Sequence, residues 1–167
     1  CSFANRAGSH HQTWQGEEFY LRAGMPADYL EQLKKMWEAR SNDGFSMPSM
    51  PSGYQRLMHG NSLRIGANIW KVVVGAGHSP EHACLHCEEL GVMLSGDQIL
   101  PIITSNVSVQ PTAPYANPML GCLLSHEKFK AQLPDDTLVL PAHNDPFYGL
   151  HARLQELIDH HEDRMLI

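Results

Sequence analysis

The stretch VVVGAGHSPEH, residues 72–82, combines an apolar run, a glycine-rich turn and two histidines. Its β-branched residues extend an apolar segment at 69–74, which favours a buried strand. Gly75 and Gly77 then permit a tight change of direction. His78 is therefore predicted to lie just beyond the end of a buried strand.

Two further segments have the same form. Asp97 comes directly after the apolar segment 91–95 and Gly96, and His143 comes shortly after the apolar segment 137–140. Strands that pack side by side bring such ends to one edge of a sheet, where the sites of open α/β sheets usually lie. We therefore expect the imidazoles of His78 and His143 and the carboxylate of Asp97 to converge.

The rest of the chain predicts an α/β layered domain. Local pattern leaves segment 78–91 open between helix and strand and slightly favours a helix, because Ser-Pro-Glu at 79–81 is a good helix start. The other expected elements are helices at 12–41 with a break at Gly24, a hairpin at 62–74, a polar surface loop at 98–116, and helices at 117–133 and 149–165.

The composition excludes several classes of protein. The chain carries a net charge of −6 with histidine neutral, whereas a nucleic-acid-binding surface needs basic residues to neutralise phosphates. The same charge disfavours anionic membranes, and no apolar run approaches the roughly 20 residues of a membrane span. We therefore expect a small-molecule substrate as partner, and neither nucleic acid nor membrane.

Histidines and cysteines are the side chains most relevant to chemistry. Eleven histidines are present, and neutral imidazole is the commonest metal ligand in proteins. The four cysteines, Cys1, Cys84, Cys87 and Cys122, are too few and too unevenly spaced for a disulfide framework. Free thiols are the simpler interpretation, and they predict a reducing, cytoplasmic location.

Together, the three strand-end segments resemble the last three metal motifs of the metallo-β-lactamase superfamily, in order and in spacing. They are GHSPEH at 77–82, SGD at 95–97 and LPAH at 140–143. The resemblance covers roughly residues 60–167. It implies an α/β fold that is half of a metallo-β-lactamase-type αββα sandwich, a mixed sheet with helices packed on it. It also implies two hairpin strands, not a helix, at 83–87 and 91–95.

The resemblance further implies a site with two metal ions. His78 would complete the first metal site, Asp97 would bridge both ions as the catalytic carboxylate, and His143 would complete the second site. Imidazole and carboxylate suit zinc, and also iron or manganese. Such a metal pair can hold a hydroxide at neutral pH. The implied reaction is hydrolysis of an ester-like bond, with thioesters or lactones favoured by the resemblance to glyoxalase II-like members.

One part of the family pattern is absent. Full members carry an upstream His-x-His-x-Asp-His motif, and the pair His10-His11 does not replace it. We therefore expect the C-terminal part of a metal-dependent hydrolase, with residues 1–58 as a helical insertion or lid with its linker and residues 59–167 as a half-domain. The alternative is a non-catalytic half-domain, with no metal bound, that acts by self-association or partner binding. Whether this chain is itself an enzyme stays open between the two.

Three other features have their own interpretations. The segment CLHC at 84–87 suggests a zinc-binding interaction module, but residues 84 and 87 of a strand point to opposite faces. His82 is expected to support the site and not to bind metal, and His160-His161 is expected on a solvated helix face. Two interpretations stay open for the polar residues Ser105, Asn106 and Ser108. They either line a substrate pocket or belong to an ordinary polar loop.

Overall fold

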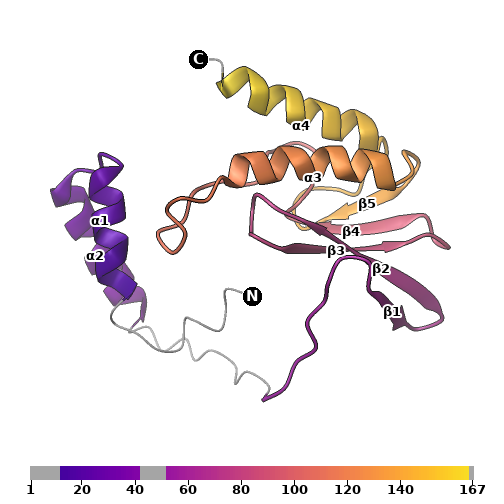
Figure 1. The fold of residues 1–167 in the computed structure, drawn as a ribbon, viewed down its shortest axis with the longest axis horizontal. Coiled ribbons are helices and arrows are strands. Elements are labelled where there is room, and N and C mark those ends of the chain that lie inside the picture. Colours follow the sequence, from indigo (N-terminus) through magenta and orange to yellow (C-terminus); the bar gives the residue numbers. More distant parts are fainter. Residues whose placement is uncertain (1–11, 42–51, 166–167) are drawn as a thin grey trace. The chain divides into compact units, whose positions relative to one another are not determined.

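The computed structural model describes residues 12–41 and 52–165 (Figure 1). These fall into two compact units. One unit contains residues 12–41, 52–55 and 109–116, and the other contains residues 56–108 and 117–165. The division of the chain at residue 58 into a lid and a half-domain stays a prediction.

The first unit contains two helices, as the sequence predicts. They are α1 (Gln12–Arg22) and α2 (Ala27–Ser41). Gly24, with a φ of 86°, stands in the turn between them, where a residue with a Cβ would be strained. The Lys34 ammonium lies 2.8 Å from the Glu17 carboxylate and so joins the two helices.

The second unit contains a five-stranded mixed sheet in the order β1-β2-β3-β4-β5. Its first four strands form an antiparallel meander, and β5 pairs parallel to β4. The local preference for a helix at 78–91 is therefore wrong, and the hairpin implied by the family resemblance is right. The strands are β1 (Ser62–Ile65), β2 (Asn68–Gly75), β3 (His82–Cys87), β4 (Val92–Gly96) and β5 (Leu138–Pro141).

Two helices cover one face of this sheet (Figure 1). Helix α3 (Pro118–Gln132) connects β4 to β5, and α4 (Leu150–Met165) follows β5. Asn117 caps α3, because its side-chain oxygen accepts a hydrogen bond from the Leu120 amide, and Pro118 occupies the first turn, where no amide hydrogen is needed. The result is the predicted α/β architecture of a mixed sheet with helices packed on it.

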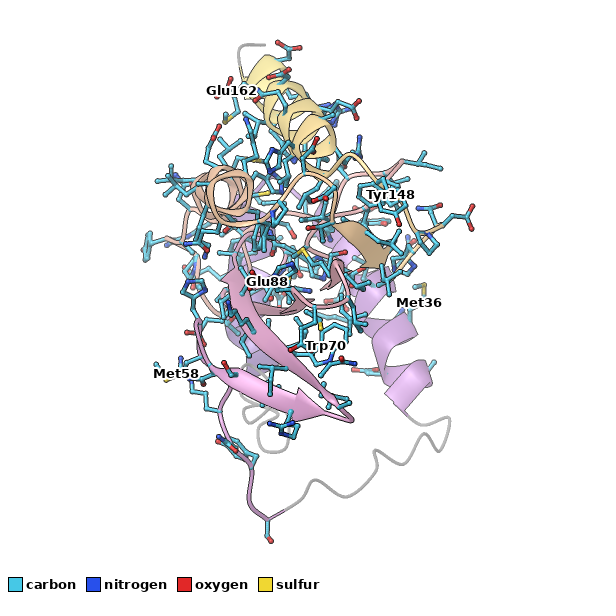
Figure 2. The ribbon with its side chains drawn as sticks, turned by 90° about the vertical axis from the view of Figure 1, so that its right-hand side faces the viewer. Met36, Met58, Trp70, Glu88, Tyr148 and Glu162 are labelled. Carbon is cyan, nitrogen blue, oxygen red and sulfur yellow. The ribbon has the colours of Figure 1, made fainter. Side chains whose placement is uncertain are left out.

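The core lies between the sheet and these helices. Side chains that alternate along the strands meet apolar residues of α3 and α4. The intervening strand residues, such as Trp70, point to the other face of the sheet (Figure 2). The core contains Val73, Cys84, Met93 and Val139 from the sheet, Ile99 and Leu133 from loops, and Phe129, Leu150, Leu154 and Leu157 from the helices.

Two expectations about burial are wrong in part. Residues 98–116 contain no helix or strand, but the loop is not wholly at the surface, because Gln98, Ile99 and Leu100 are buried and Ile99 packs in the core. His160 is exposed as expected, but His161 is not on a solvated face, since it is only 7% exposed. Its spacing from Leu154 and Leu157 places it on the buried side of α4.

Buried His126 on α3 predicts that the fold is sensitive to acid. Burial lowers the pKa of His126 from the ordinary value of 6.5 to about 4. The unfolded chain therefore binds a proton that the folded chain does not, and stability falls as pH drops from 6.5 towards 4. This shift corresponds to about 3 kcal/mol.

Denaturant unfolding between pH 7.5 and pH 4 measures this effect. The variant His126→Gln cannot take up the proton. Between pH 7.5 and pH 4 its free energy of unfolding should therefore fall by about 3 kcal/mol less than that of the unmodified chain. An identical pH dependence in the two proteins would show that His126 is protonated normally in the fold.

Candidate metal centre

The C-terminal ends of three strands meet at one edge of the sheet. Strands β2, β4 and β5 run in the same direction, because β3 is antiparallel to both β2 and β4 and because β5 is parallel to β4. The Ala142 amide donates a 3.0 Å hydrogen bond to the Gly96 carbonyl, which ties the end of β5 to the end of β4. The residues that follow these strands are therefore neighbours.

The three predicted side chains lie together at this edge. His143 Nε2 is 3.3 Å from Asp97 Oδ1, and His78 Nε2 is 3.6 Å from Asp97 Oδ2. Each carboxylate oxygen thus faces a different imidazole. The side chains of His78 and Asp97 are about one-third exposed and that of His143 is 63% exposed, so the group is open to solvent. Their role as metal ligands remains a prediction.

A hydrogen bond fixes how His78 faces Asp97. His78 Nδ1 lies 3.1 Å from the backbone carbonyl of Asn106. A carbonyl only accepts, so Nδ1 of the neutral ring carries the hydrogen and Nε2 presents a lone pair towards Asp97. A lone pair that faces a carboxylate oxygen is favourable only with a cation between them. The 3.6 Å separation is too long for a shared proton to form a good hydrogen bond.

The separations suit a metal ion. Two ligand atoms at about 2.1 Å from a tetrahedral ion stand about 3.4 Å apart, close to the 3.3 Å and 3.6 Å found here. Throughout 12–41 and 52–165, however, no three histidine, cysteine, aspartate or glutamate side chains are grouped around one ion position. The two separations each suit one imidazole and one carboxylate oxygen on an ion, and that these are half of a two-metal centre stays a prediction.

His82 lies beside this group. The rings of His78 and His82 are 5.8 Å apart and meet edge to face. A Cβ on Gly96 would come within 2.6 Å of His82 Nε2, so the turn that carries Asp97 passes directly over this ring. Burial lowers the pKa of His82, and the neighbouring His78 lowers it further. This position agrees with a supporting role, which stays a prediction.

Helix α3 and Gln98 hold the loop that carries His78, and the sequence did not predict these contacts. The Ala76 amide donates a 2.8 Å hydrogen bond to Ser125 Oγ, and Gln98 Nε2 donates to the Ala76 carbonyl at 3.1 Å. A Cβ on Gly77 would lie 2.7 Å from Cys122 Cβ. The repeated glycines at 75–77 were the available signal, since glycine permits such close approach of two backbones.

The cysteines are poorly placed for the rival zinc-binding module. Cys84 and Cys87 are fully buried free thiols three residues apart on β3, so their side chains point to opposite faces. Cys84 Sγ donates to the Ser95 carbonyl at 3.4 Å, and burial raises the pKa of this thiol to about 12. A thiolate ligand is therefore disfavoured there. Cys1 and the pair His10-His11 lie outside the described residues.

The loop residues Ser105 and Asn106 contact the site from outside the sheet. The Ser105 hydroxyl donates to the backbone carbonyl of Asp97, and the Asn106 carbonyl accepts from His78. Ser108 is exposed. The first two residues therefore support the candidate ligands, and a part in lining a substrate pocket stays a prediction for all three.

Solved structures identify the architecture. A beta-lactamase domain protein from Burkholderia ambifaria matches with 47% identity and a TM-score of 0.66, over 71% of this chain and 36% of that one. A metallo-beta-lactamase family protein from Thermus thermophilus matches with 23% identity and a TM-score of 0.72, over 93% and 47%. The chain has the metallo-β-lactamase fold. Its partial coverage of these proteins fits the C-terminal half of that fold.

Curated proteins point in the same direction. The probable metallo-hydrolase YqjP from Bacillus subtilis (strain 168) is 30% identical over an alignment of 111 residues, and the match covers 62% of this chain. The chain spans about a third, 34%, of the length of this relative. The solved protein TTHA1623, in a di-iron-bound form, matches with 26% identity and a TM-score of 0.51, over 70% of this chain and 54% of that one.

Two findings are negative. No model of a known protein family matches the chain. Among the helices within 12–41 and 52–165, none combines the length and the apolar character that crossing a bilayer requires.

Proposed function

We propose that this chain is the C-terminal part of a metal-dependent hydrolase and contributes half of its two-metal centre. The observation that carries the proposal is that the two oxygens of Asp97 face two different imidazoles. The orientation of His78 adds to it, since its Nε2 lone pair faces Asp97 across a cation-sized gap. The similarity to metallo-hydrolases supports the same class.

His78 and Asp97 Oδ2 would hold one ion, and His143 and Asp97 Oδ1 would hold the other. Two divalent ions supply a Lewis acid and lower the pKa of water towards neutrality. The chain's own residues orient the site: Asp97 would hold both ions through its two oxygens, and the Asn106 carbonyl holds the His78 ring. The exposure of His143 leaves the site open to a substrate from solvent.

Zinc is the ion we propose, because imidazole nitrogen and carboxylate oxygen are its usual ligands. Iron or manganese would suit the same donors, and a protein of similar fold binds two iron ions. The proposed substrates are small molecules with an ester-like bond, and thioesters or lactones are favoured by the resemblance to glyoxalase II-like proteins. Fold alone does not fix the substrate.

A hydrolysis assay tests this function. The chain is purified alone and also joined to any upstream segment that its gene encodes, and each form is given a thioester, a lactone and a phosphodiester. The joined form should hydrolyse the thioester or the lactone, lose this activity to a chelator and regain it with zinc. Chelator-resistant hydrolysis, or none from the joined form, would contradict the proposal.

A second candidate function rests on the face of the sheet away from α3 and α4. This face is apolar across four strands; Val72 on it is fully buried, whereas Leu94 is 37% exposed. Such a surface usually marks an interaction site. A non-catalytic half-domain would cover this face by self-association as a homo-oligomer, whereas the hydrolase would cover it with the rest of its fold. Activity of the joined form in the assay above distinguishes the two. The residues of this face are Trp70, Val72, Val74, Leu85, Leu94, Leu138 and Leu140.

A further inference from the structure

The loop at 97–106 forms hydrogen bonds with two of the candidate ligands, Asp97 and His78. Ser105 donates its hydroxyl hydrogen to the Asp97 carbonyl. The next residue, Asn106, accepts the Nδ1 hydrogen of His78 at 3.1 Å through its backbone carbonyl. The position of these two consecutive residues therefore decides whether the acceptor for the His78 ring is in place.

The side chain of Arg153 on α4 holds this loop. Its Nε donates to the Leu100 carbonyl at 2.7 Å, and its Nη2 donates to the Ile103 carbonyl at 3.1 Å. The Arg153 side chain is only 14% exposed, so these charge-assisted bonds are partly shielded from water. Ile102 and Ile103, by contrast, are 76% and 48% exposed, so the loop has little apolar anchorage beyond Leu100.

We propose that Arg153 is a positioning residue for His78. The guanidinium fixes the backbone at Leu100 and Ile103, and this places the Asn106 carbonyl against His78 Nδ1. The ring is thereby kept in the tautomer that turns the Nε2 lone pair towards Asp97. If the carbonyl moves away, the ring can turn and carry its hydrogen on Nε2, which then occupies the position that a metal would take.

The tautomer of His78 is a property of the metal-free chain and can be measured without any metal. Only the expected effect of Arg153 on metal binding rests on the proposed function. Long-range proton–nitrogen NMR spectra at a pH where His78 is neutral report which ring nitrogen carries the hydrogen. His78→Gln assigns the signals. Competition with a chromophoric chelator reports the affinity of the 167-residue chain for zinc.

The decisive variant is Arg153→Lys, which keeps the charge but cannot span two carbonyls with a planar fork. The matched control is Glu156→Gln. It removes the 2.9 Å ion pair from Arg153 Nη1 and leaves both bonds to the loop. Ser105→Ala is a second, milder variant that loosens the same loop from Asp97.

The expected result is an Nδ1–H tautomer in the unmodified chain and in Glu156→Gln, and a shift towards Nε2–H in Arg153→Lys and, to a smaller degree, in Ser105→Ala. Zinc affinity should fall roughly tenfold in Arg153→Lys. An unchanged His78 tautomer in a folded Arg153→Lys protein would overturn the inference. Absence of zinc binding to the unmodified chain would count against the proposed function and leave the tautomer test intact.

Discussion

Replacing Asp97 with asparagine should weaken zinc binding to the site by more than about 100-fold, since loss of an outer-shell hydrogen bond already costs roughly 10–100-fold. The amide keeps the shape of the side chain but loses the negative charge. One of its two positions becomes an NH2 group that cannot bind a cation. Because His78 and His143 face different oxygens of Asp97, either orientation of the amide removes a ligand atom from one ion position.

Chelator competition measures the affinity, with Asp136→Asn as the matched control. Asp136 is an exposed aspartate in the turn before β5, so its replacement makes the same change in net charge away from the site. The control should bind zinc as the unmodified chain does. Equal affinities in Asp97→Asn and in the unmodified chain would mean that zinc binds elsewhere.

Gly77→Ala should destabilise the chain by about 3 kcal/mol, because two costs add. Gly77 has a φ of 116°, which L side chains rarely adopt. The new Cβ would also lie 2.7 Å from Cys122 Cβ and 3.0 Å from Cys122 Cα, so that the loop and α3 must move apart. Neither neighbouring atom is the end of a flexible side chain. His78, the next residue, should therefore shift as well, and zinc affinity should fall with stability.

Gly91→Ala separates the two costs. Gly91 also has a positive φ, 62°, but a Cβ there would meet nothing within 4 Å. Only the conformational cost applies, and a loss of about 1 kcal/mol is expected. Denaturant unfolding of the two variants gives the difference. Similar losses in both variants would indicate that α3 does not press against the His78 loop in solution.

The sequence was sufficient to predict the ends of the strands and the side chains that follow them. Apolar runs mark β2, β4 and β5, and the residue types directly after each run gave His78, Asp97 and His143. Segment 78–91 shows the limit of local pattern. Ser79-Pro80-Glu81 favours a helix start, yet pairing with β2 and β4 makes residues 82–87 a strand, because the ladder satisfies backbone groups on both sides.

Contacts between distant residues could not be predicted in this way. Arg153 binds the Leu100 carbonyl 53 positions away, and nothing in the loop composition indicates this. The burial of Ile99 and His161 depends likewise on where the helices pack against the sheet. What sequence reasoning identified is therefore the candidate ligand set, and what it missed is the set of residues that hold those ligands in place.

Anomalous X-ray diffraction at the zinc edge, from crystals of the chain grown with zinc, locates any bound ions directly. We expect two peaks about 3.5–4 Å apart. One peak should lie about 2.1 Å from His78 Nε2 and Asp97 Oδ2, and the other about 2.1 Å from His143 Nε2 and Asp97 Oδ1. Peaks at other residues, with His78 and His143 turned away from Asp97, would contradict this expectation.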